Sequence, residues 1–430
     1  MIVPAFSSMN GRPRITGNLQ EGGVRPEDDA AGTAMKLKLV EKNSPESLVS
    51  RVGESIPPSG IREFFDIVYS TPDCISLGVG EPDFVTPWRI SDSGIFAIKD
   101  GNTHYTPNRG LPELRELIVE YVASQYNVRY NPDSELVVTM GVSQGLDLAL
   151  RSILNPGDEV IIFEPCYVSY TANVELLHGK PVVIPTHQKD RFKIDIDVLK
   201  KSITARTKAV MLNYPSNPTG STIDEETLGK VAELAMRHNL IVLSDEIYCA
   251  LSYDRKHFSI ASIPEMKSRT IYLNGFSKSH AMTGWRLGYV GGPKFLIDIM
   301  MKIHQYTALC ASSMAQYAAI EALRKGEKDV IAMRKEYLKR RNFIAGRFNE
   351  IGLECLVPEG AFYVFPDVSG TGLTGREFAL QLLGSEKVAV VPGRAFGECG
   401  NSHIRCSYAT SMENLRESMI RIERFVKGLK

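Results

Sequence analysis

The chain has 430 residues, of which 43% are hydrophobic, and it carries 50 basic and 50 acidic side chains. That length predicts two domains, or one large domain with a smaller companion. A net charge of zero gives no electrostatic reason to expect nucleic acid or an anionic membrane as a partner. No apolar stretch reaches the roughly 18 to 20 residues that a membrane span needs.

Residues 1–50 differ in composition from the rest of the chain. They are polar, rich in Gly and Pro, and without hydrophobic periodicity, so we expect a disordered tail. The tail lacks the apolar core of a secretion signal, and we expect a cytoplasmic protein. Two alternatives stay open. Arg12 and Arg14 stand among hydroxyl side chains in a stretch without acids, as in organelle transit peptides, and Met35 is a second candidate for the translated start, which would leave residues 1–34 outside the mature protein.

The cysteines and histidines predict a reduced protein without a metal site. There are seven cysteines, an odd number, and no two of them are spaced as CxxC. The eight histidines also lack the spacing that is typical of metal ligands. We therefore expect neither a disulfide framework nor a zinc site.

From about residue 110 to 290, apolar runs alternate with helical patterns. Leu, Ile and Val at helical intervals predict helices over 111–126, 143–154, 167–179 and 223–239. Continuous apolar runs predict strands over 135–141, 158–165, 180–186, 207–213, 240–248 and 270–276. Strands that are apolar throughout and alternate with helices favour an α/β fold, a mostly parallel sheet with helices on both faces.

The chain after about residue 310 has a different pattern. Long helical stretches are followed by short strand-like runs separated by turn signals, and a last helix begins near Met412. This pattern favours a smaller α+β domain, completed by the segment 51–95. We therefore expect a large domain over 96–310 and a small domain made of 51–95 and 311–430.

Distinctive polar residues and a glycine stand at the end of, or just after, the apolar residues of five predicted strands. They are Gly141, Tyr167, Asn217, Asp245 and Lys278. In a parallel sheet, ligands bind at the carboxyl ends of the strands, so these residues predict a single site at one edge of the sheet. Taken alone, a lysine such as Lys278 is more often a solvated cation on a loop, and the other four residues are what favour a functional role.

The residue types at this edge suit pyridoxal phosphate. Lys278 is the candidate nucleophile for the aldehyde, and Asp245 can keep the ring nitrogen protonated. Tyr248 and Asn217 can donate to the phenolic oxygen, and Tyr167 can stack on the ring. The phosphate needs backbone N–H groups at a helix start and a cation. The sequence offers these at Gly141, Val142, Ser143 and Arg286.

Several motifs, in the same order, resemble the class I and II aminotransferases, which are fold type I pyridoxal-phosphate enzymes. They are LGVGEPDF, YTPNRGLPELR, NYPSNPTG, SDEIY, SK with MTGWRLGY, GAFYVFP, VVPG and IRCSYA. The resemblance covers about residues 56–430. It implies an enzyme that moves an amino group from an L-amino acid to a 2-oxo acid such as 2-oxoglutarate, with pyridoxal 5'-phosphate as cofactor.

The resemblance also implies roles toward the cofactor. Lys278 resembles the lysine that holds the cofactor as a Schiff base and moves the proton, with Asp245 and Tyr248 beside it. Ser277 precedes this lysine and resembles a phosphate contact. Tyr105 resembles a phosphate contact that the partner subunit donates, which implies a homodimer with shared active sites.

For the substrate, Gly80 and Arg405 resemble the groups that hold the α-carboxylate, Arg405 through a bidentate pair. Tyr167 and Asn217 resemble further substrate contacts. In an acid-preferring branch of the family, a lysine stands where this chain has Ser143. The sequence therefore leaves open whether the donor is an aromatic amino acid, an aliphatic one or aspartate.

Some nearby residues have simpler interpretations, and two rival functions stay open. We expect Arg109 to be structural or on the surface, and Glu81 and Asp83 to be turn and cap residues. A β-lyase or cyclising lyase would use the same fold and the same lysine. A regulatory protein could bind the cofactor without catalysis, but the presence of both Lys278 and Asp245 favours an enzyme.

Overall fold

The computed structural model describes residues 48–58, 60 and 71–429. The predicted tail over 1–50 therefore lies outside the described residues, except for 48–50. The chain divides into two units, 1–54 and 55–430. A short helix, α2 (Arg51–Ser55), begins in the first unit. The other elements reported below belong to the second unit, and each unit is treated by itself.

The second unit is built around a sheet of seven strands in the order β2-β8-β7-β6-β5-β3-β4. Strands β7, β6, β5, β3 and β4 are parallel, whereas β8 is antiparallel to both of its neighbours. The predicted α/β fold with a mostly parallel sheet is confirmed. The sequence did not predict β8, whose short run GYVG has a low strand propensity. The bounds are β2 (Leu136–Thr139), β3 (Glu159–Glu164), β4 (Lys180–Pro185), β5 (Thr207–Asn213), β6 (Ile241–Asp245), β7 (Thr270–Gly275) and β8 (Gly288–Gly291).

Helices cover both faces of this sheet, because successive side chains along a buried strand point to opposite faces. On one face, Ile162 and Leu243 pack with α6, α7 and α10. On the other face, Ile161 and Val242 pack with α8 and α9, while Tyr272 packs with α5. The bounds are α5 (Pro112–Tyr126), α6 (Gly141–Ile153), α7 (Ser169–Leu176), α8 (Ile196–Ser202), α9 (Glu225–Arg237) and α10 (Lys294–Thr307).

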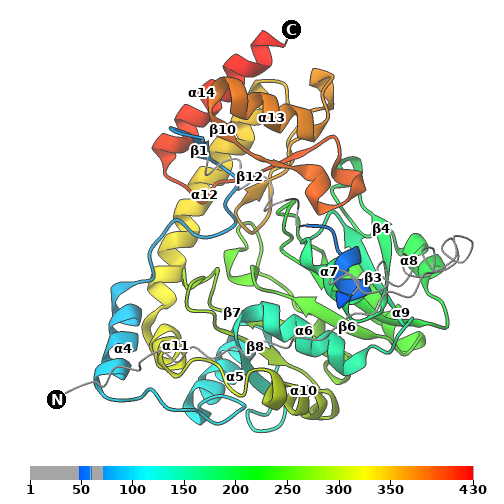
Figure 1. The fold of residues 1–430 in the computed structure, drawn as a ribbon, viewed down its shortest axis with the longest axis vertical. Helices are drawn as coiled ribbons and strands as arrows, with labels where there is room; N and C mark the ends of the chain where they lie inside the picture. The colour runs from blue at the N-terminus through cyan, green and yellow to red at the C-terminus, as the bar shows by residue number, and fades with distance from the viewer. Residues whose placement is uncertain (1–47, 59, 61–70, 430) are drawn as a thin grey trace, which may run out of the picture. The chain divides into compact units, whose positions relative to one another are not determined.

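The C-terminal part of the chain adds two small sheets and three helices. β1 pairs with β10 in parallel, and β12 lies between β11 and β9 in an antiparallel sheet. Figure 1 shows α12 running from the end where α4 and α11 lie toward α13 and α14. The bounds are β1 (Ile75–Ser76), β9 (Tyr363–Val364), β10 (Val388–Ala389), β11 (Val391–Pro392), β12 (Ile404–Ser407), α12 (Glu327–Glu350), α13 (Gly375–Glu386) and α14 (Met412–Gly428).

One helix of the predicted small domain packs on an element of the predicted large one, and a second helix runs across the predicted boundary at residue 95. α4 (Trp88–Lys99) and α11 (Ser313–Lys325) lie against each other, and α11 also packs on α5. Ile90, Leu114 and Ala318 from the three helices share one apolar cluster. The division of residues 51–430 into two domains stays a prediction.

Short 3₁₀ helices connect the larger elements at 188–190, 249–251, 260–262, 266–268, 369–371, 393–396 and 398–400.

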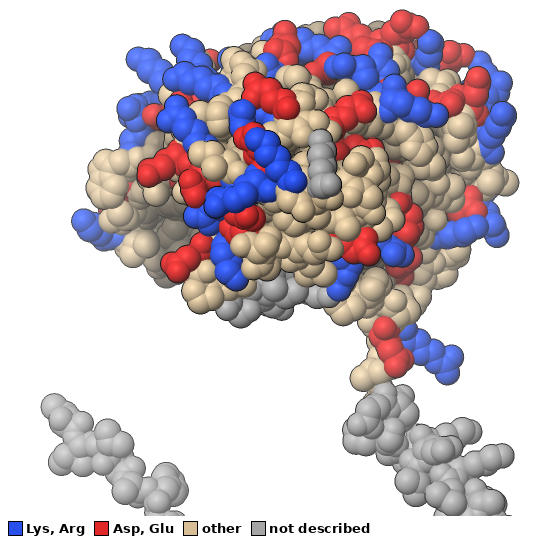
Figure 2. Space-filling model, turned by 90° about the horizontal axis from the view of Figure 1, so that it is seen from above, with Lys and Arg blue, Asp and Glu red and all other residues tan. Residues whose placement is uncertain are grey.

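The surface and the cysteines have simple properties. Figure 2 shows one face on which basic and acidic side chains are interspersed. All seven cysteines are free thiols. None of the helices in the described part of the chain combines the length and the apolarity needed to cross a bilayer. Over the same residues, no cluster of three or more His, Cys, Asp or Glu side chains is placed to hold a metal ion.

Candidate active site

A cavity of about 610 Å³ opens where β5, β6 and β7 end. The first turn of α6, residues 79–81, and side chains of β9 and β12 complete its wall. The cavity brings together most of the residues that the sequence assigned to one site: Gly80, Val142, Ser143, Tyr167, Asn217, Asp245, Tyr248, Ser277, Lys278, Arg286 and Arg405. Gly141 begins α6 directly before Val142, whereas Tyr105 does not line the cavity.

Lys278 lies in the loop that follows β7. Its Nζ donates to the carbonyl oxygen of Gly80 over 2.6 Å, and the rings of Tyr248 and Phe362 lie 5.9 and 5.8 Å from it. Burial lowers the pKa of this amine to about 8, although the Glu81 carboxylate raises it. A lysine with a lowered pKa has a larger neutral fraction near pH 7 and is therefore a better nucleophile.

Asp245 ends β6 and is buried, with 5% of its surface exposed. Its Oδ2 accepts a hydrogen bond from the hydroxyl of Tyr170 over 2.7 Å, and its Oδ1 accepts one from the backbone N–H of Ile247 over 3.2 Å. Burial raises the pKa of Asp245 to about 6, and these two donors oppose the increase. The charged form of such a buried carboxylate is stabilised when a cationic partner lies beside it.

The start of α6 and Arg286 form a cradle for an anion. Gly141 has a φ of +73°, and a Cβ at this position would lie 2.9 Å from the guanidinium Nη2 of Arg286. Glycine therefore lets the guanidinium approach the first turn of the helix closely. Arg286 is held by a bond from its Nη1 to the carbonyl oxygen of Thr283, over 3.0 Å. Backbone N–H groups at a helix start together with a guanidinium are the groups that bind phosphate.

Arg405 supplies a second, fully buried cation. Its Nη1 donates to Oδ1 of Asn217 over 3.0 Å, and its Nη2 donates to the carbonyl oxygen of Gly78 over 2.5 Å. The guanidinium carbon lies 4.6 Å from the ring centre of Tyr363 and 4.8 Å from that of Phe396. Its Nε is buried and has no hydrogen-bond partner among the described residues. A planar cation held in this way suits a bidentate contact with a carboxylate.

Tyr170, Tyr363 and Glu81 are among the cavity residues that were not assigned to the site from the sequence. Tyr170 holds Asp245, and the hydroxyl of Tyr363 lies 2.8 Å from that of Tyr248. Glu81, interpreted as a turn residue, lines the cavity and accepts a hydrogen bond from Thr283. Tyr363 stands inside the GAFYVFP motif, which was a usable signal. Tyr170 and Glu81 depend on long-range contacts that no local pattern reveals.

Other residues lie where simpler interpretations placed them. Arg109 forms an ion pair of 3.0 Å with Asp298 and does not line the cavity. Asp83 accepts two hydrogen bonds from Arg340, of 2.8 and 2.9 Å. Tyr105 is 84% exposed in this single chain. A contact of Tyr105 with phosphate requires a second subunit and stays a prediction.

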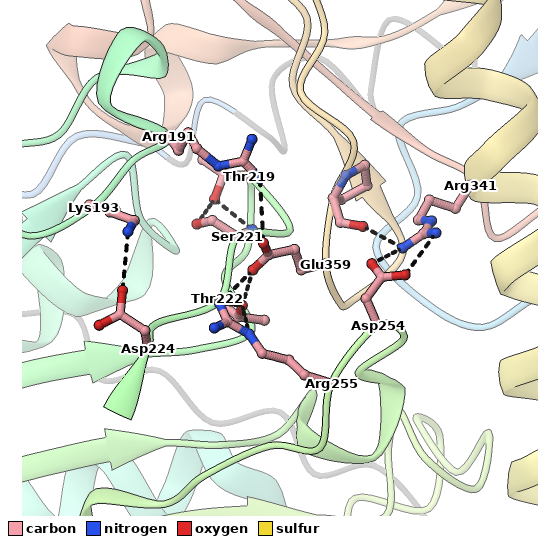
Figure 3. Close-up of polar contacts among 11 residues, drawn as sticks. Arg191, Lys193, Thr219, Ser221, Thr222, Asp224, Asp254, Arg255, Arg341 and Glu359 are labelled. Atoms are coloured by element: carbon pink, nitrogen blue, oxygen red, sulfur yellow. Dashed lines mark hydrogen bonds and ion pairs between the residues drawn. The ribbon is translucent and has the colours of Figure 1, made fainter. Parts of the chain in front are cut away.

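Figure 3 shows a polar cluster around Glu359, Thr222 and Arg255. Thr222 lies next in sequence to the turn that contains Asn217. The carboxylate of Glu359 accepts hydrogen bonds from the hydroxyl of Thr222 and from Nη2 of Arg255, the latter over 2.8 Å. The backbone N–H of Glu359 donates to the carbonyl oxygen of Gly220 over 2.9 Å. Because Gly220 closes the turn that contains Asn217, this cluster fixes the turn against the chain that leads into β9.

A family model described as aminotransferase class I and II matches residues 72–422. The chain belongs to this family. The aminotransferase is 47% identical to the aspartate aminotransferase of Pyrococcus abyssi over 378 residues, which are 87% of this chain and 97% of the relative. It is 42% identical over 380 residues to aromatic-amino-acid aminotransferase 2 of Thermococcus litoralis, covering 88% and 98% of the two chains. The crystal structure of the aromatic aminotransferase from Pyrococcus horikoshii superposes with a TM-score of 0.81 at 45% identity, covering 85% of this chain and 99% of that one.

The predicted family, activity and cofactor are confirmed: this is a pyridoxal-phosphate-dependent aminotransferase that acts on amino acids and 2-oxo acids. The residues present fit the cofactor. The raised pKa of buried Asp245 suits a cationic ring nitrogen beside it. The close approach of Arg286 to Gly141 suits the phosphate, and the amine of Lys278 lines the same cavity.

Proposed function

We propose that transamination takes place in the cavity around Lys278, with the sequence-assigned residues in the roles given below. The observation that carries this proposal is that Lys278, Asp245 and Arg405 line one cavity although they come from the loop after β7, from β6 and from β12. An amine of lowered pKa, a buried carboxylate and a buried guanidinium are the three groups that a cofactor-assisted proton transfer on an amino acid requires.

Several side chains would hold the cofactor. Pyridoxal phosphate supplies, when bound, an electron sink for the bonds of the substrate's α-carbon. Lys278 would hold it covalently through Nζ, and Asp245 would hold the proton on its ring nitrogen. The remaining contacts would come from Tyr167, Asn217 and Tyr248 around the ring and from Gly141, Val142, Ser143, Ser277 and Arg286 around the phosphate.

The substrate would bind through its α-carboxylate. Arg405 is placed for this because its guanidinium is buried, lines the cavity and keeps one N–H that finds no partner among the described residues. Asn217 fixes the orientation of that guanidinium, and Gly80 and Tyr167 lie on the same cavity wall. The amine of Lys278 would then take the α-proton at Nζ in the first half of the reaction, and in the second half it would give a proton to the α-carbon of the new amino acid. Aromatic, aliphatic and acidic amino acids are the candidate donors, with 2-oxoglutarate as acceptor.

The working form would be a homodimer in which Tyr105 reaches the partner's cavity. Tyr105 is 84% exposed, and Trp88 and Phe96 on α4 expose 73% and 64% of their surface. Large exposed apolar side chains are typical of an interface between proteins. The cytoplasmic location stays a prediction.

Mixing two inactive variants tests the shared site. Lys278→Ala and Tyr105→Ala homodimers should each have little activity. Mixed dimers would contain one cavity with both native residues, so activity should return after subunit exchange. No recovery, although mass spectrometry finds mixed dimers, would show that Tyr105 does not serve the partner's cavity.

A half-reaction tests the proposed chemistry. An amino acid added without any 2-oxo acid should convert the bound cofactor to its amine form, with one oxo acid released per cavity. A lyase would instead continue to release ammonia without an acceptor. A protein that binds the cofactor for regulation would show neither change.

A further inference from the structure

Residues 78–86 are bonded to the loop 277–286 at several points around Lys278. The bonds are Lys278 Nζ to the Gly80 carbonyl (2.6 Å), Thr283 Oγ1 to Glu81 Oε2 (2.9 Å), Thr86 Oγ1 to the Ala281 carbonyl (2.6 Å) and Trp285 Nε1 to Thr86 Oγ1 (3.0 Å). The amine of Lys278 therefore lies between its own loop and the segment that carries Glu81. A carboxylate held here by Thr283 is fixed on the wall of the cavity that the amine faces.

The charged groups around Lys278 are two cations and two anions. Arg286 and Arg405 disfavour its charged form, whereas Asp245 and Glu81 favour it. Asp245 already accepts hydrogen bonds from Tyr170 and from the N–H of Ile247. In the proposed function its carboxylate pairs with the protonated ring nitrogen of the cofactor. Glu81 is the anion with the larger influence on Lys278. Its Oε2 accepts from the hydroxyl of Thr283, and no ion pair engages its carboxylate among the described residues.

From this geometry we propose that Glu81 is a positioning residue, held by Thr283, whose carboxylate stabilises the charged form of the nitrogen of Lys278. This inference rests on the proposed function, because it assumes that Lys278 carries the cofactor. It gives the acid of the GEPDF motif a role that a turn residue does not have.

The physical reason is an imbalance of charge in the cavity. Two guanidinium groups and burial all drive the nitrogen of Lys278 toward its neutral form. Without a compensating anion, the proton on this nitrogen would be lost at a lower pH. Glu81 is exposed, so solvent screens its field and the effect should be modest. The rings of Tyr248 and Phe362 near Nζ also favour its charged form, as Glu81 does, but they do not titrate near neutral pH.

The test is a pH titration of the absorbance of the bound cofactor in the holoenzyme, which reports the protonation of the nitrogen that links it to Lys278. Glu81→Gln should move the midpoint to lower pH by about half a unit. Glu81→Asp keeps the charge and should move it less, and Thr283→Ala should shift it in the same direction as Glu81→Gln, because it releases the carboxylate. The matched control is Asp83→Asn, which removes an acid two positions further along that pairs with Arg340 outside the cavity and should leave the midpoint unchanged.

The outcomes separate this inference from the proposed function. If Glu81→Gln leaves the midpoint at its wild-type value or raises it, the inference is overturned while the proposed function stands. An equal shift in Asp83→Asn also overturns it, because the cause would then be a distortion of the segment. A wild-type cofactor that borohydride does not fix to Lys278 contradicts the proposed function, and the inference falls with it.

Discussion

The hydroxyl of Tyr170 donates to Oδ2 of Asp245 over 2.7 Å, and both side chains are buried. This bond joins the start of α7 to the end of β6. Burial raises the pKa of Asp245 to about 6, while Tyr170 and the N–H of Ile247 hold it down. Tyr170 therefore keeps Asp245 ionised in a place where burial alone would favour the neutral acid.

Tyr170→Phe should weaken the binding of the cofactor. Losing a hydrogen bond to a charged group costs about 1.5–3 kcal/mol, so we expect the dissociation constant of the cofactor to rise about 10- to 100-fold. The loss should be larger at pH 6 than at pH 8, because the pKa of Asp245 would rise further and more of it would be protonated at the lower pH. Cofactor titration monitored by absorbance measures this.

Tyr121→Phe is the matched control for that experiment. Tyr121 contacts another tyrosine hydroxyl, that of Tyr126, and does not line the cavity. The control should keep the cofactor affinity of the wild type. If both variants lost affinity to the same degree at both pH values, Tyr170 would be a packing residue without a specific effect on Asp245.

Lys278→Ala should leave a folded protein that binds the cofactor without a covalent bond and turns over negligibly. In the proposed function one amine both holds the cofactor and moves the α-proton, so we expect no other side chain to replace it. Borohydride treatment followed by mass spectrometry checks this. Covalent fixation of the cofactor at a single other lysine in this variant would show that the nucleophile has been assigned wrongly.

Asp245→Asn and Arg405→Gln should damage different steps. A neutral amide cannot hold the proton on the ring nitrogen, so Asp245→Asn should slow removal of the α-proton by several orders of magnitude. Arg405→Gln should mainly weaken substrate binding, by about 2–5 kcal/mol, because a buried bidentate contact with the carboxylate is lost. Stopped-flow half-reactions separate the rate from the affinity. Small and equal effects of both changes would contradict the proposed roles.

The carboxylate of Asp245 should lower the stability of the cofactor-free protein at neutral pH. The pKa of Asp245 rises from 3.8 to about 6 on folding. Between these values the folded state binds more protons than the unfolded state, so this group makes stability fall as the pH rises through about 6. At pH 7.5 Asp245→Asn should therefore stabilise the cofactor-free protein by about 1–3 kcal/mol, and near pH 4 the two proteins should be about equal.

Thermal midpoints at both pH values check this expectation. Saturating cofactor should reverse the order, because the carboxylate of the wild type gains a cationic partner. A variant that is less stable than the wild type at pH 7.5 without cofactor would show that Asp245 is stabilised by its two donors more than burial destabilises it.

Much of the cavity was predictable because its residues follow readable strands. Asp245 and Lys278 come after continuous apolar runs, and the parallel sheet brings the carboxyl ends of these runs together. The motif resemblance then placed Arg405, which lies on a strand of a different sheet.

Tyr170 and Glu81 were not assigned from the sequence because their contacts in the cavity join residues that are distant in sequence. Tyr170 reaches Asp245 across 75 positions, and Glu81 reaches Thr283 across 202. A tyrosine in an apolar helix is equally well explained as a core residue, and an acid beside proline is equally well explained as part of a turn. The boundary near residue 310 was hard to place for a related reason: α11 follows it in sequence but packs on α5, which precedes it.

The last prediction concerns the amino donor. The cavity is lined by three cations, Lys278, Arg286 and Arg405, which the proposed function uses for the cofactor and the α-carboxylate. Ser143, at the position where an acid-preferring branch of the family has a lysine, lines the cavity as a neutral residue. Arg109, a further cation in the nearby PNRG stretch, is paired with Asp298 and does not line the cavity. A second carboxylate on the substrate therefore meets no free cation among the described residues of this chain.

We therefore expect aromatic or aliphatic amino acids to rival or exceed aspartate as donors. Burying a carboxylate without a partner is costly, whereas an apolar side chain meets no such cost. Values of kcat/KM for aspartate, phenylalanine, tyrosine, alanine, leucine and methionine, each with 2-oxoglutarate, check this. Ser143→Lys should raise the value for aspartate relative to phenylalanine, and Ser143→Met, of similar length but neutral, is its control. A wild-type preference for aspartate above about tenfold, which is only about 1.4 kcal/mol in transition-state binding, would show that another residue supplies the missing charge and that Ser143 is a poor guide to the donor.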